Sequence, residues 1–210
     1  MVLMSDQENE NPAESNYWDS LYQEGSTPWD LGEAPPAFVA LLEGSDAPAP
    51  GRLISIGAGR GNDARLFAAH GFDVLGIDFA PTAVDEATRL AEEHGLRSNL
   101  HFEQRDMFNL PAEYIGAFDY VLEHTCLSAI GPTRYAEYAR VVADLLKPGG
   151  LFIALFFNHG RPGGPPFTIS ADEVRSLFAE LLQIEHLAAP EQQHPQRSGP
   201  ELFGLLRKPA

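Results

Sequence analysis

A glycine-rich loop that follows a short apolar run constrains the fold of this chain more than any other feature. The run Arg52-Leu-Ile-Ser-Ile56 predicts a buried strand, because it is short, apolar and followed by glycines. Gly57-Ala-Gly59-Arg-Gly61 comes next, and residues 62–70 are typical of a helix that Gly71 ends. A strand, a glycine turn and a helix in this order predict the first unit of an α/β sheet that binds its ligand beside the turn.

The rest of the chain continues to alternate strands with helices. Further strands are predicted at residues 72–77, 100–104, 118–122, 151–157, 183–187 and 202–206, and further helices at 82–94, 132–146 and 171–181, with a turn at 147–150. Alternation of this kind predicts a mostly parallel sheet with helices on both faces. The last two strands have no helix between them, so they are expected to form an antiparallel hairpin at one edge. The predicted fold class is α/β, with a Rossmann-like sheet of seven strands.

An acidic residue stands at the end of the second predicted strand. Asp78 lies 21 residues after Gly57, the length of one helix and one strand, which brings its carboxylate next to the glycine loop. There it can accept hydrogen bonds from both hydroxyls of a ribose. Asn62 occupies the third glycine position of the dinucleotide fingerprint, and the loop lacks the Lys-Ser/Thr pair of a phosphate-binding loop. These features predict a nucleoside site without a pyrophosphate cradle, which disfavours an NAD-dependent oxidoreductase.

Composition narrows the class of partner. Of the 210 residues, 30 are acidic and 14 are basic, so the formal net charge is −16 and no basic patch is available for a nucleic-acid backbone. No apolar stretch reaches the ~20 residues of a membrane-spanning helix, and the start of the chain lacks the basic and apolar regions of a secretory signal. We therefore expect a small-molecule substrate and a cytoplasmic location, with no membrane or nucleic-acid partner. The oligomeric state stays open, and a monomer is compatible with the sequence.

Cysteine and histidine give no sign of a metal site. Cys126 is the single cysteine, which excludes an internal disulfide and a zinc site built from cysteines. The seven histidines never fall at ligand spacing with carboxylates on one predicted helix, so we expect no bound metal.

The first 45 residues divide into two parts. Residues 1–33 hold eight acids and no Lys or Arg, and residues 1–13 are predicted to be a disordered acidic tail. Disordered tails are poor in aromatic residues, yet the chain from Glu14 onwards contains Trp18, Tyr22 and Trp29. Residues 14–45 are therefore predicted to be an ordered arm over the site, within a single domain that spans residues 14–210.

Further motifs accompany the glycine loop and Asp78. They are Arg105-Asp106-Met107, Lys147-Pro-Gly-Gly150, Trp18-(three residues)-Tyr22, Thr27-Pro28-Trp29-Asp30, Phe118-Asp119 leading into Ala129-Ile130, and Gly163-Gly-Pro-Pro-Phe167. Taken together, these segments resemble class I S-adenosylmethionine-dependent methyltransferases, and more narrowly the thiopurine, thiol, thiocyanate and halide methyltransferase family. The resemblance runs from about Glu14 to Lys208.

The resemblance implies a binding role for particular residues. Around the methionine portion of S-adenosylmethionine it places Trp18, Tyr22, Trp29, Glu123 and His124. It places Gly57 and Gly59 against the cofactor, Asp78 at the ribose, and Phe79, Asp106 and Met107 at the adenine, where Asp106 accepts from the amino group. It implies that Trp29 and Phe167 face the substrate. The arm also makes physical sense by itself, because aromatic faces attract the sulfonium cation of this cofactor.

The resemblance implies an enzyme that moves a methyl group to a small soft nucleophile, such as a thiol, thiocyanate, a halide or a thiopurine sulfur, by in-line displacement. A neutral thiol gains from a base, and we name His124 as the candidate catalytic residue. Halide and thiocyanate members of the family tend to have Trp at position 22 and Tyr at position 124, so Tyr22 and His124 leave the acceptor open. The alternatives are a methyltransferase for a tellurium or selenium oxyanion or another small metabolite, and a non-catalytic S-adenosylmethionine-binding protein.

Overall fold

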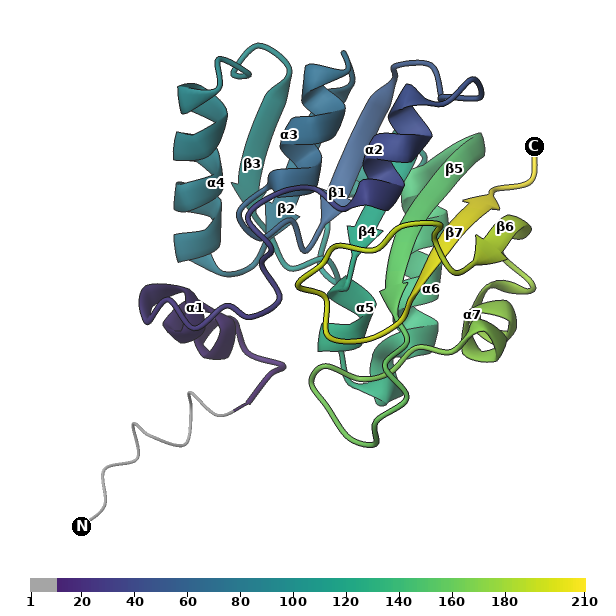
Figure 1. The fold of residues 1–210 in the computed structure, drawn as a ribbon. Coiled ribbons are helices and arrows are strands. Elements are labelled where there is room, and N and C mark those ends of the chain that lie inside the picture. The colour runs from purple at the N-terminus through teal and green to yellow at the C-terminus, as the bar shows by residue number, and fades with distance from the viewer. Residues whose placement is uncertain (1–10) are drawn as a thin grey trace.

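The computed structural model describes residues 11–210, so most of the tail predicted at residues 1–13 lies outside the described residues. One seven-stranded sheet forms the centre, in the order β3-β2-β1-β4-β5-β7-β6 (Figure 1). The strands are β1 Arg52–Ile56, β2 Asp73–Asp78, β3 Leu100–Gln104, β4 Phe118–His124, β5 Leu146–Phe157, β6 Gln183–Ala188 and β7 Glu201–Arg207. The helices are α1 Ser15–Gln23, α2 Pro36–Glu43, α3 Asn62–Ala69, α4 Pro81–Glu93, α5 Cys126–Ala129, α6 Tyr135–Leu145 and α7 Ala171–Phe178, with short 3₁₀ turns η2 Ala112–Tyr114 and η3 Pro132–Arg134.

The strand directions confirm the predicted fold class. Strands β1 to β5 pair in parallel, whereas β7 runs antiparallel to both β5 and β6 at one edge. The chain order reverses between β1 and β4, which is where sheets of this kind open a crevice at the carboxyl ends of their strands. The fold therefore places the glycine loop after β1 and Asp78 at the end of β2 beside that crevice.

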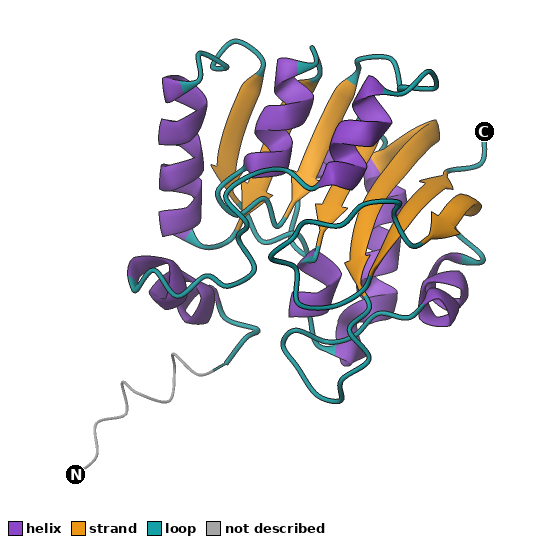
Figure 2. Ribbon diagram, in the orientation of Figure 1, coloured by secondary structure: helices purple, strands orange, loops and turns teal. Residues whose placement is uncertain are grey.

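Helices cover both faces of the sheet, as predicted (Figure 2). On one face α2, α3 and α4 pack against the strands, and their core includes the buried side chains of Phe38, Phe67 and Leu122. On the other face α5, α6 and α7 bury a second set that includes Tyr138 and Phe156. Within residues 11–210, no helix combines the length and the apolar character that crossing a bilayer requires.

Several element boundaries differ from the sequence prediction. The helix predicted at 132–146 is divided into η3 and α6, and the turn predicted at 147–150 is a bulge inside β5. The strand pairing passes there from Phe118 opposite Leu146 to Tyr120 opposite Leu151. The capping box at Ser170 opens α7 as predicted, but the helix ends at 178 instead of 181.

The predicted arm contains helices that the sequence did not indicate. Helix α1 lies across the start of α4, near the carboxyl ends of the strands (Figure 1). The N-cap residue of α4 is Ala80, which has no capping side chain, and Asp19 of α1 accepts the Thr82 backbone N–H at 2.8 Å instead. Tyr22 packs against Ala80 and Ala83. The arm thus completes the first turn of α4 and is held beside the crevice.

Candidate active site

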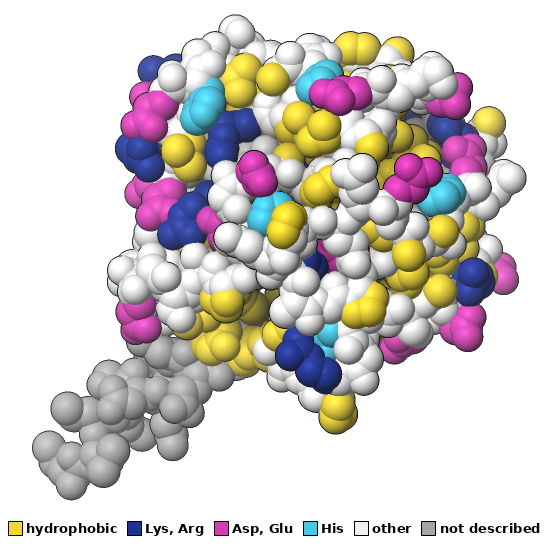
Figure 3. Space-filling view, viewed as in Figure 1, with side chains coloured by type: hydrophobic (Ala, Val, Ile, Leu, Met, Phe, Trp, Pro, Cys, Tyr) yellow, Lys and Arg dark blue, Asp and Glu magenta, His cyan; other side chains and the backbone are white. Residues whose placement is uncertain are grey.

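A cavity of about 900 Å³ lies at the carboxyl ends of the strands. This volume is near the upper end of the range for sites that hold drug-sized ligands. The surface is hollowed beside α1, where hydrophobic side chains gather (Figure 3). Every predicted site residue except Glu123 lines the cavity, namely Trp18, Tyr22, Trp29, Gly57, Gly59, Asp78, Phe79, Asp106, Met107, His124 and Phe167.

The glycine loop approaches two neighbouring elements closely. Gly57 and Gly59 have φ values of 59° and 53°, in the left-handed region that L side chains rarely adopt. A Cβ atom at Gly57 would lie 2.7 Å from the Cys126 Sγ, and one at Gly59 would lie 2.9 Å from the Tyr22 Oη. The loop therefore needs glycine for both its conformation and its packing between α5 and the arm.

Asp78 supports the same loop with its carboxylate. Its Oδ2 accepts the Gly59 N–H at 2.9 Å and its Oδ1 accepts the Ala80 N–H at 3.0 Å. Packing around the carboxylate raises its pKa above the ordinary value, although these N–H donors act in the opposite direction. A carboxylate offers about four acceptor positions, so Asp78 keeps acceptor capacity on the cavity side.

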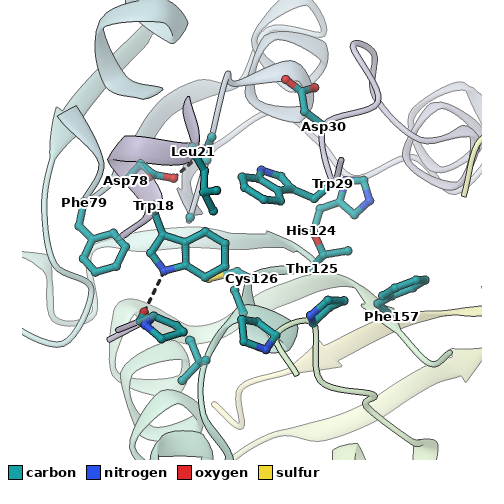
Figure 4. Close-up of a pocket in the computed structure, with 18 of the residues that line it drawn as sticks. Trp18, Leu21, Trp29, Asp30, Asp78, Phe79, His124, Thr125, Cys126 and Phe157 are labelled. Atoms are coloured by element: carbon teal, nitrogen blue, oxygen red, sulfur yellow. Dashed lines mark hydrogen bonds between the residues drawn. The ribbon is translucent and has the colours of Figure 1, made fainter. Parts of the chain in front are cut away.

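The aromatic residues of the arm form a wall across the cavity. Trp18 and Trp29 extend between Asp78 and Phe79 on one side and His124 and Phe157 on the other (Figure 4). The Trp18 and Trp29 rings meet edge to face with centroids 5.3 Å apart. Trp29 also donates its Nε1–H to the Tyr22 Oη at 3.3 Å, so the rings hold one another in place.

Arg60, between the glycines of the loop, ties the arm to the sheet. Its Nη1 donates to Thr27 Oγ1 at 2.6 Å and to Asp30 Oδ2 at 2.8 Å, and its Nε pairs with Glu86 of α4. Asn62 donates to the other oxygen of Asp30 at 2.7 Å. The glycine loop after β1, which lines the cavity, therefore also fixes the position of the arm.

His124, at the end of β4, is enclosed by charged side chains. Its Nδ1 lies 2.9 Å from Asp63 Oδ2, and its Nε2 lies 2.6 Å from Arg197 Nη2 and 3.7 Å from Glu201 Oε1. Burial lowers the pKa of His124, but Asp63 and Glu201 outweigh this effect and raise it to about 9. Thr125, which follows directly, has a φ of 60° and is the one non-glycine residue with positive φ among residues 11–210. Strained backbone of this kind is concentrated at functional sites.

The position of Glu123 differs from the one expected from the sequence. Its side chain lies under the cavity wall and does not line the cavity. Successive side chains of a strand point to opposite faces, so Glu123 and His124 cannot both face the cavity. Glu123 is fully buried, and its Oε2 accepts the Leu127 N–H at 2.9 Å and the Tyr138 hydroxyl at 3.0 Å. Burial raises its pKa to about 7.

Substituting Glu123 with Gln should therefore change stability in a pH-dependent manner. As pH rises from about 4.5 to above 7, the unfolded chain releases this proton while the folded protein retains it, so the wild type loses about 3 kcal/mol of stability. The amide of the variant carries no charge and escapes this loss. Urea unfolding should show the stability of Glu123→Gln relative to wild type rising by that amount between pH 4.5 and pH 8. The control is Glu180→Gln at an exposed position, whose stability relative to wild type should not change with pH. The same pH-independent difference in Glu123→Gln would contradict the raised pKa of Glu123.

The sequence prediction missed the part of the cavity that the loop between β6 and β7 contributes. Gln196, Arg197 and Ser198 line the cavity, together with Asp63 from the start of α3. No motif marks this loop. Its position follows from topology, because an antiparallel β7 begins at the edge where the parallel strands end. The antiparallel hairpin was predicted, and it was the one signal that could have placed the loop at the site.

The sheet order, the glycine loop and the acid at the end of β2 define a class I methyltransferase. The family of thiopurine S-methyltransferases (TPMT) matches residues 13–203, and the chain belongs to this family. It is an S-adenosylmethionine-dependent methyltransferase, and solved methyltransferases of the same fold carry bound S-adenosylhomocysteine.

Individual relatives cover nearly the whole chain. The probable thiol methyltransferase 2 of Arabidopsis thaliana is 33% identical over 197 residues, which are 92% of this chain and 85% of the relative. Thiocyanate methyltransferase 1 of the same plant is 30% identical over 202 residues, which are 93% and 86% of the two chains. A solved structure described as "Conversion of a Disulfide Bond into a Thioacetal Group during Echinomycin Biosynthesis" is similar with a TM-score of 0.77 and 25% identity, over 93% of each chain.

Proposed function

We propose that this enzyme transfers the methyl group of S-adenosylmethionine to a small soft nucleophile, above all a thiol, thiocyanate or thiopurine sulfur, or a halide. The observation that carries the proposal is one continuous cavity under an aromatic arm, with a nucleoside-type wall at Asp78 and a second wall at His124 and Phe157. The names of the relatives point to three of these acceptors, a thiol, thiocyanate and a thiopurine.

The residues at the Asp78 end fit S-adenosylmethionine. Asp78 offers acceptors to a ribose, and Phe79 and Met107 offer apolar surface to an adenine beside Asp106. The Phe108 N–H donates to Asp106 Oδ1 at 2.9 Å, which fixes that carboxylate at the end of β3. A Cβ at Gly59 would lie 2.9 Å from the Tyr22 Oη, so the loop and the arm leave room only for glycine at this point of the cavity wall. These features support the cofactor-binding roles predicted for the residues.

When bound, the cofactor would supply a methyl group on a sulfonium sulfur, and the rest of the cofactor is a neutral thioether leaving group. The protein's contribution is to align the acceptor with that methyl group and to exclude water, and alignment alone is worth several kcal/mol. Trp18, Tyr22 and Trp29 provide aromatic faces for the cation, worth about 2 kcal/mol or more in a desolvated site. Trp29 and Phe167 would contact the acceptor.

The remaining parts of the proposal concern the chain as a whole. Residues 14–45 would act as a lid within a single domain at 14–210. A small molecule would be the substrate, in the cytoplasm. The comparisons do not favour a tellurium or selenium oxyanion as acceptor, nor a protein without catalytic activity.

The proposal is tested by turnover on a panel of acceptors. S-adenosylhomocysteine formation would be followed with an uncharged thiol, thiocyanate, iodide, a thiopurine and tellurite, each at saturating S-adenosylmethionine and with a control that lacks acceptor. We expect turnover on one or more of the sulfur acceptors and none on tellurite. Binding of S-adenosylmethionine without turnover on any sulfur acceptor or halide would refute the proposal.

A further inference from the structure

Four titratable or charged side chains from four different elements meet beside the acceptor end of the cavity. They are Asp63 from α3, His124 from β4, Glu201 from the start of β7 and Arg197 from the loop before it. Between 1% and 16% of each side chain is exposed. Arg197 also pairs through its Nε with Glu201 Oε1 at 2.7 Å, so the four groups form one chain of contacts.

The charges of this cluster favour the uptake of one proton. Two carboxylates and one guanidinium leave a net charge of −1 when His124 is neutral, and a net charge of zero when it is protonated. Uncompensated charge in a nearly buried cluster is costly. Asp63 Oδ1 and Glu201 Oε2 also have no hydrogen-bond partner within the described residues. Two further charges act on members of the cluster: Arg65 of α3 on Asp63, and Glu123 of β4 on His124. Helix α2 presents the Phe38 ring to His124.

The position of Arg197 decides the protonation state of His124. A guanidinium can only donate, so its 2.6 Å contact with Nε2 requires a neutral imidazole that donates from Nδ1 to Asp63. Glu201 Oε1, at 3.7 Å from Nε2, is beyond hydrogen-bond distance in this arrangement. Asp63 and Glu201 raise the pKa of His124 even with Arg197 in this position, and Arg197 acts in the opposite direction. The ring therefore takes up a proton more readily once the guanidinium turns away from Nε2.

We infer that Asp63, His124, Arg197 and Glu201 form a proton-accepting unit that lets this site methylate thiols that arrive protonated. In this step the S–H bond of the acceptor breaks, its proton moves to His124 Nε2, and its electron pair stays on the sulfur. The imidazolium donates to Asp63 and Glu201, and the guanidinium of Arg197 turns towards the thiolate. His124 is the catalytic residue of the unit, and Asp63 is a positioning residue. The inference rests on the proposed function and narrows its acceptor class.

A base at this position increases the rate for thiols but not for acceptors that are already anions. A thiol with a pKa near 8.5 is only about 3% ionised at pH 7, so a base near the reacting sulfur increases the reactive fraction. Thiocyanate and halides carry no proton and gain nothing from this base. The two kinds of acceptor therefore report separately on proton transfer and on methyl transfer.

The first test compares both kinds of acceptor in the variant His124→Gln. General bases contribute about 10²–10⁴-fold to rate, so kcat/KM for 2-mercaptoethanol should fall by that factor. The fall for thiocyanate should be much smaller, so that the thiol-to-thiocyanate ratio changes by about 100-fold or more. The control is His70→Gln, at an exposed histidine after α3, which should leave the ratio as in wild type.

The second test measures the pKa of His124 directly by NMR titration of the histidine rings, with its signal assigned by its absence from His124→Gln. In Asp63→Asn the amide oxygen can still accept the Nδ1–H, so the ring keeps its orientation while the carboxylate charge is lost. We expect the pKa of His124 to fall by about one unit or more. Since the base form is the active one, the acidic limb of the thiol pH–rate profile should move to lower pH.

The outcomes separate the inference from the proposed function. Equal losses on 2-mercaptoethanol and thiocyanate in His124→Gln, or a pKa of His124 that Asp63→Asn leaves unchanged, would overturn the proton-accepting unit alone. Wild-type protein that methylates thiocyanate or iodide but no thiol would also overturn the inference alone. Wild-type protein that methylates no sulfur acceptor and no halide would overturn the proposed function, and the inference with it.

Discussion

Replacing Asp78 with Ala is expected to weaken S-adenosylmethionine binding by about 30- to 1,000-fold. Hydrogen bonds to a charged group are worth about 1.5–3 kcal/mol each, and the carboxylate is proposed to accept from a ribose while it holds the glycine loop. The change also leaves the Gly59 and Ala80 N–H groups without their acceptor. Isothermal titration with S-adenosylmethionine measures the effect.

The matched control is Asp73→Ala, an exposed carboxylate at the other end of the same strand. It should bind S-adenosylmethionine as wild type does, because it lies far from the carboxyl ends where the cavity is. If Asp78→Ala and Asp73→Ala bind with equal affinity, Asp78 does not contact the cofactor and the assignment of the nucleoside wall is wrong.

Gly57→Ala is expected to destabilise the protein by about 2–4 kcal/mol and to abolish measurable cofactor binding. The left-handed conformation costs an L residue about 1–2 kcal/mol. The new Cβ would in addition lie 2.7 Å from Cys126 Sγ, so the loop or α5 must shift. Urea unfolding gives the first effect, and titration with S-adenosylmethionine gives the second.

Two companion variants separate conformation from crowding. Gly95 has a φ of 71° with no atom within 4 Å of an added Cβ, so Gly95→Ala should show only the conformational cost. Adding Cys126→Ala to Gly57→Ala removes the sulfur and should recover part of the stability. Equal destabilisation in Gly57→Ala and Gly95→Ala would mean that the close approach to α5 has no energetic consequence.

Local patterns predicted the features that depend on neighbours in sequence. The glycine loop, the acid after β2 and the alternation of strands and helices each follow from spacing along the chain, and the structure contains all of them. Helices α1 and α2 were not predicted: α1 is held by contacts with α4, and α2 buries Phe38 and Leu42 in the core. Their stability comes from tertiary packing, which a local pattern does not contain.

In the site, too, local spacing predicted some residues, whereas contacts between distant parts of the chain could not be predicted. Asp78 could be placed from its distance to Gly57, whereas the partners of His124 are 61 and 73 residues away in the sequence, at Asp63 and Arg197. Glu123 does not line the cavity for a local reason, because neighbouring strand residues face opposite sides. Applying that alternation to β4 would have assigned only one of Glu123 and His124 to the cavity.

The central claim is that one cavity holds both the cofactor and a sulfur acceptor. A crystal structure of the protein with S-adenosylhomocysteine and thiocyanate tests it most directly. The account predicts the ribose on Asp78, the adenine beside Phe79, and the cofactor sulfur under Trp18 and Trp29 with thiocyanate between it and His124. A cofactor whose ribose lies away from Asp78, or a thiocyanate bound outside this cavity, would contradict the account.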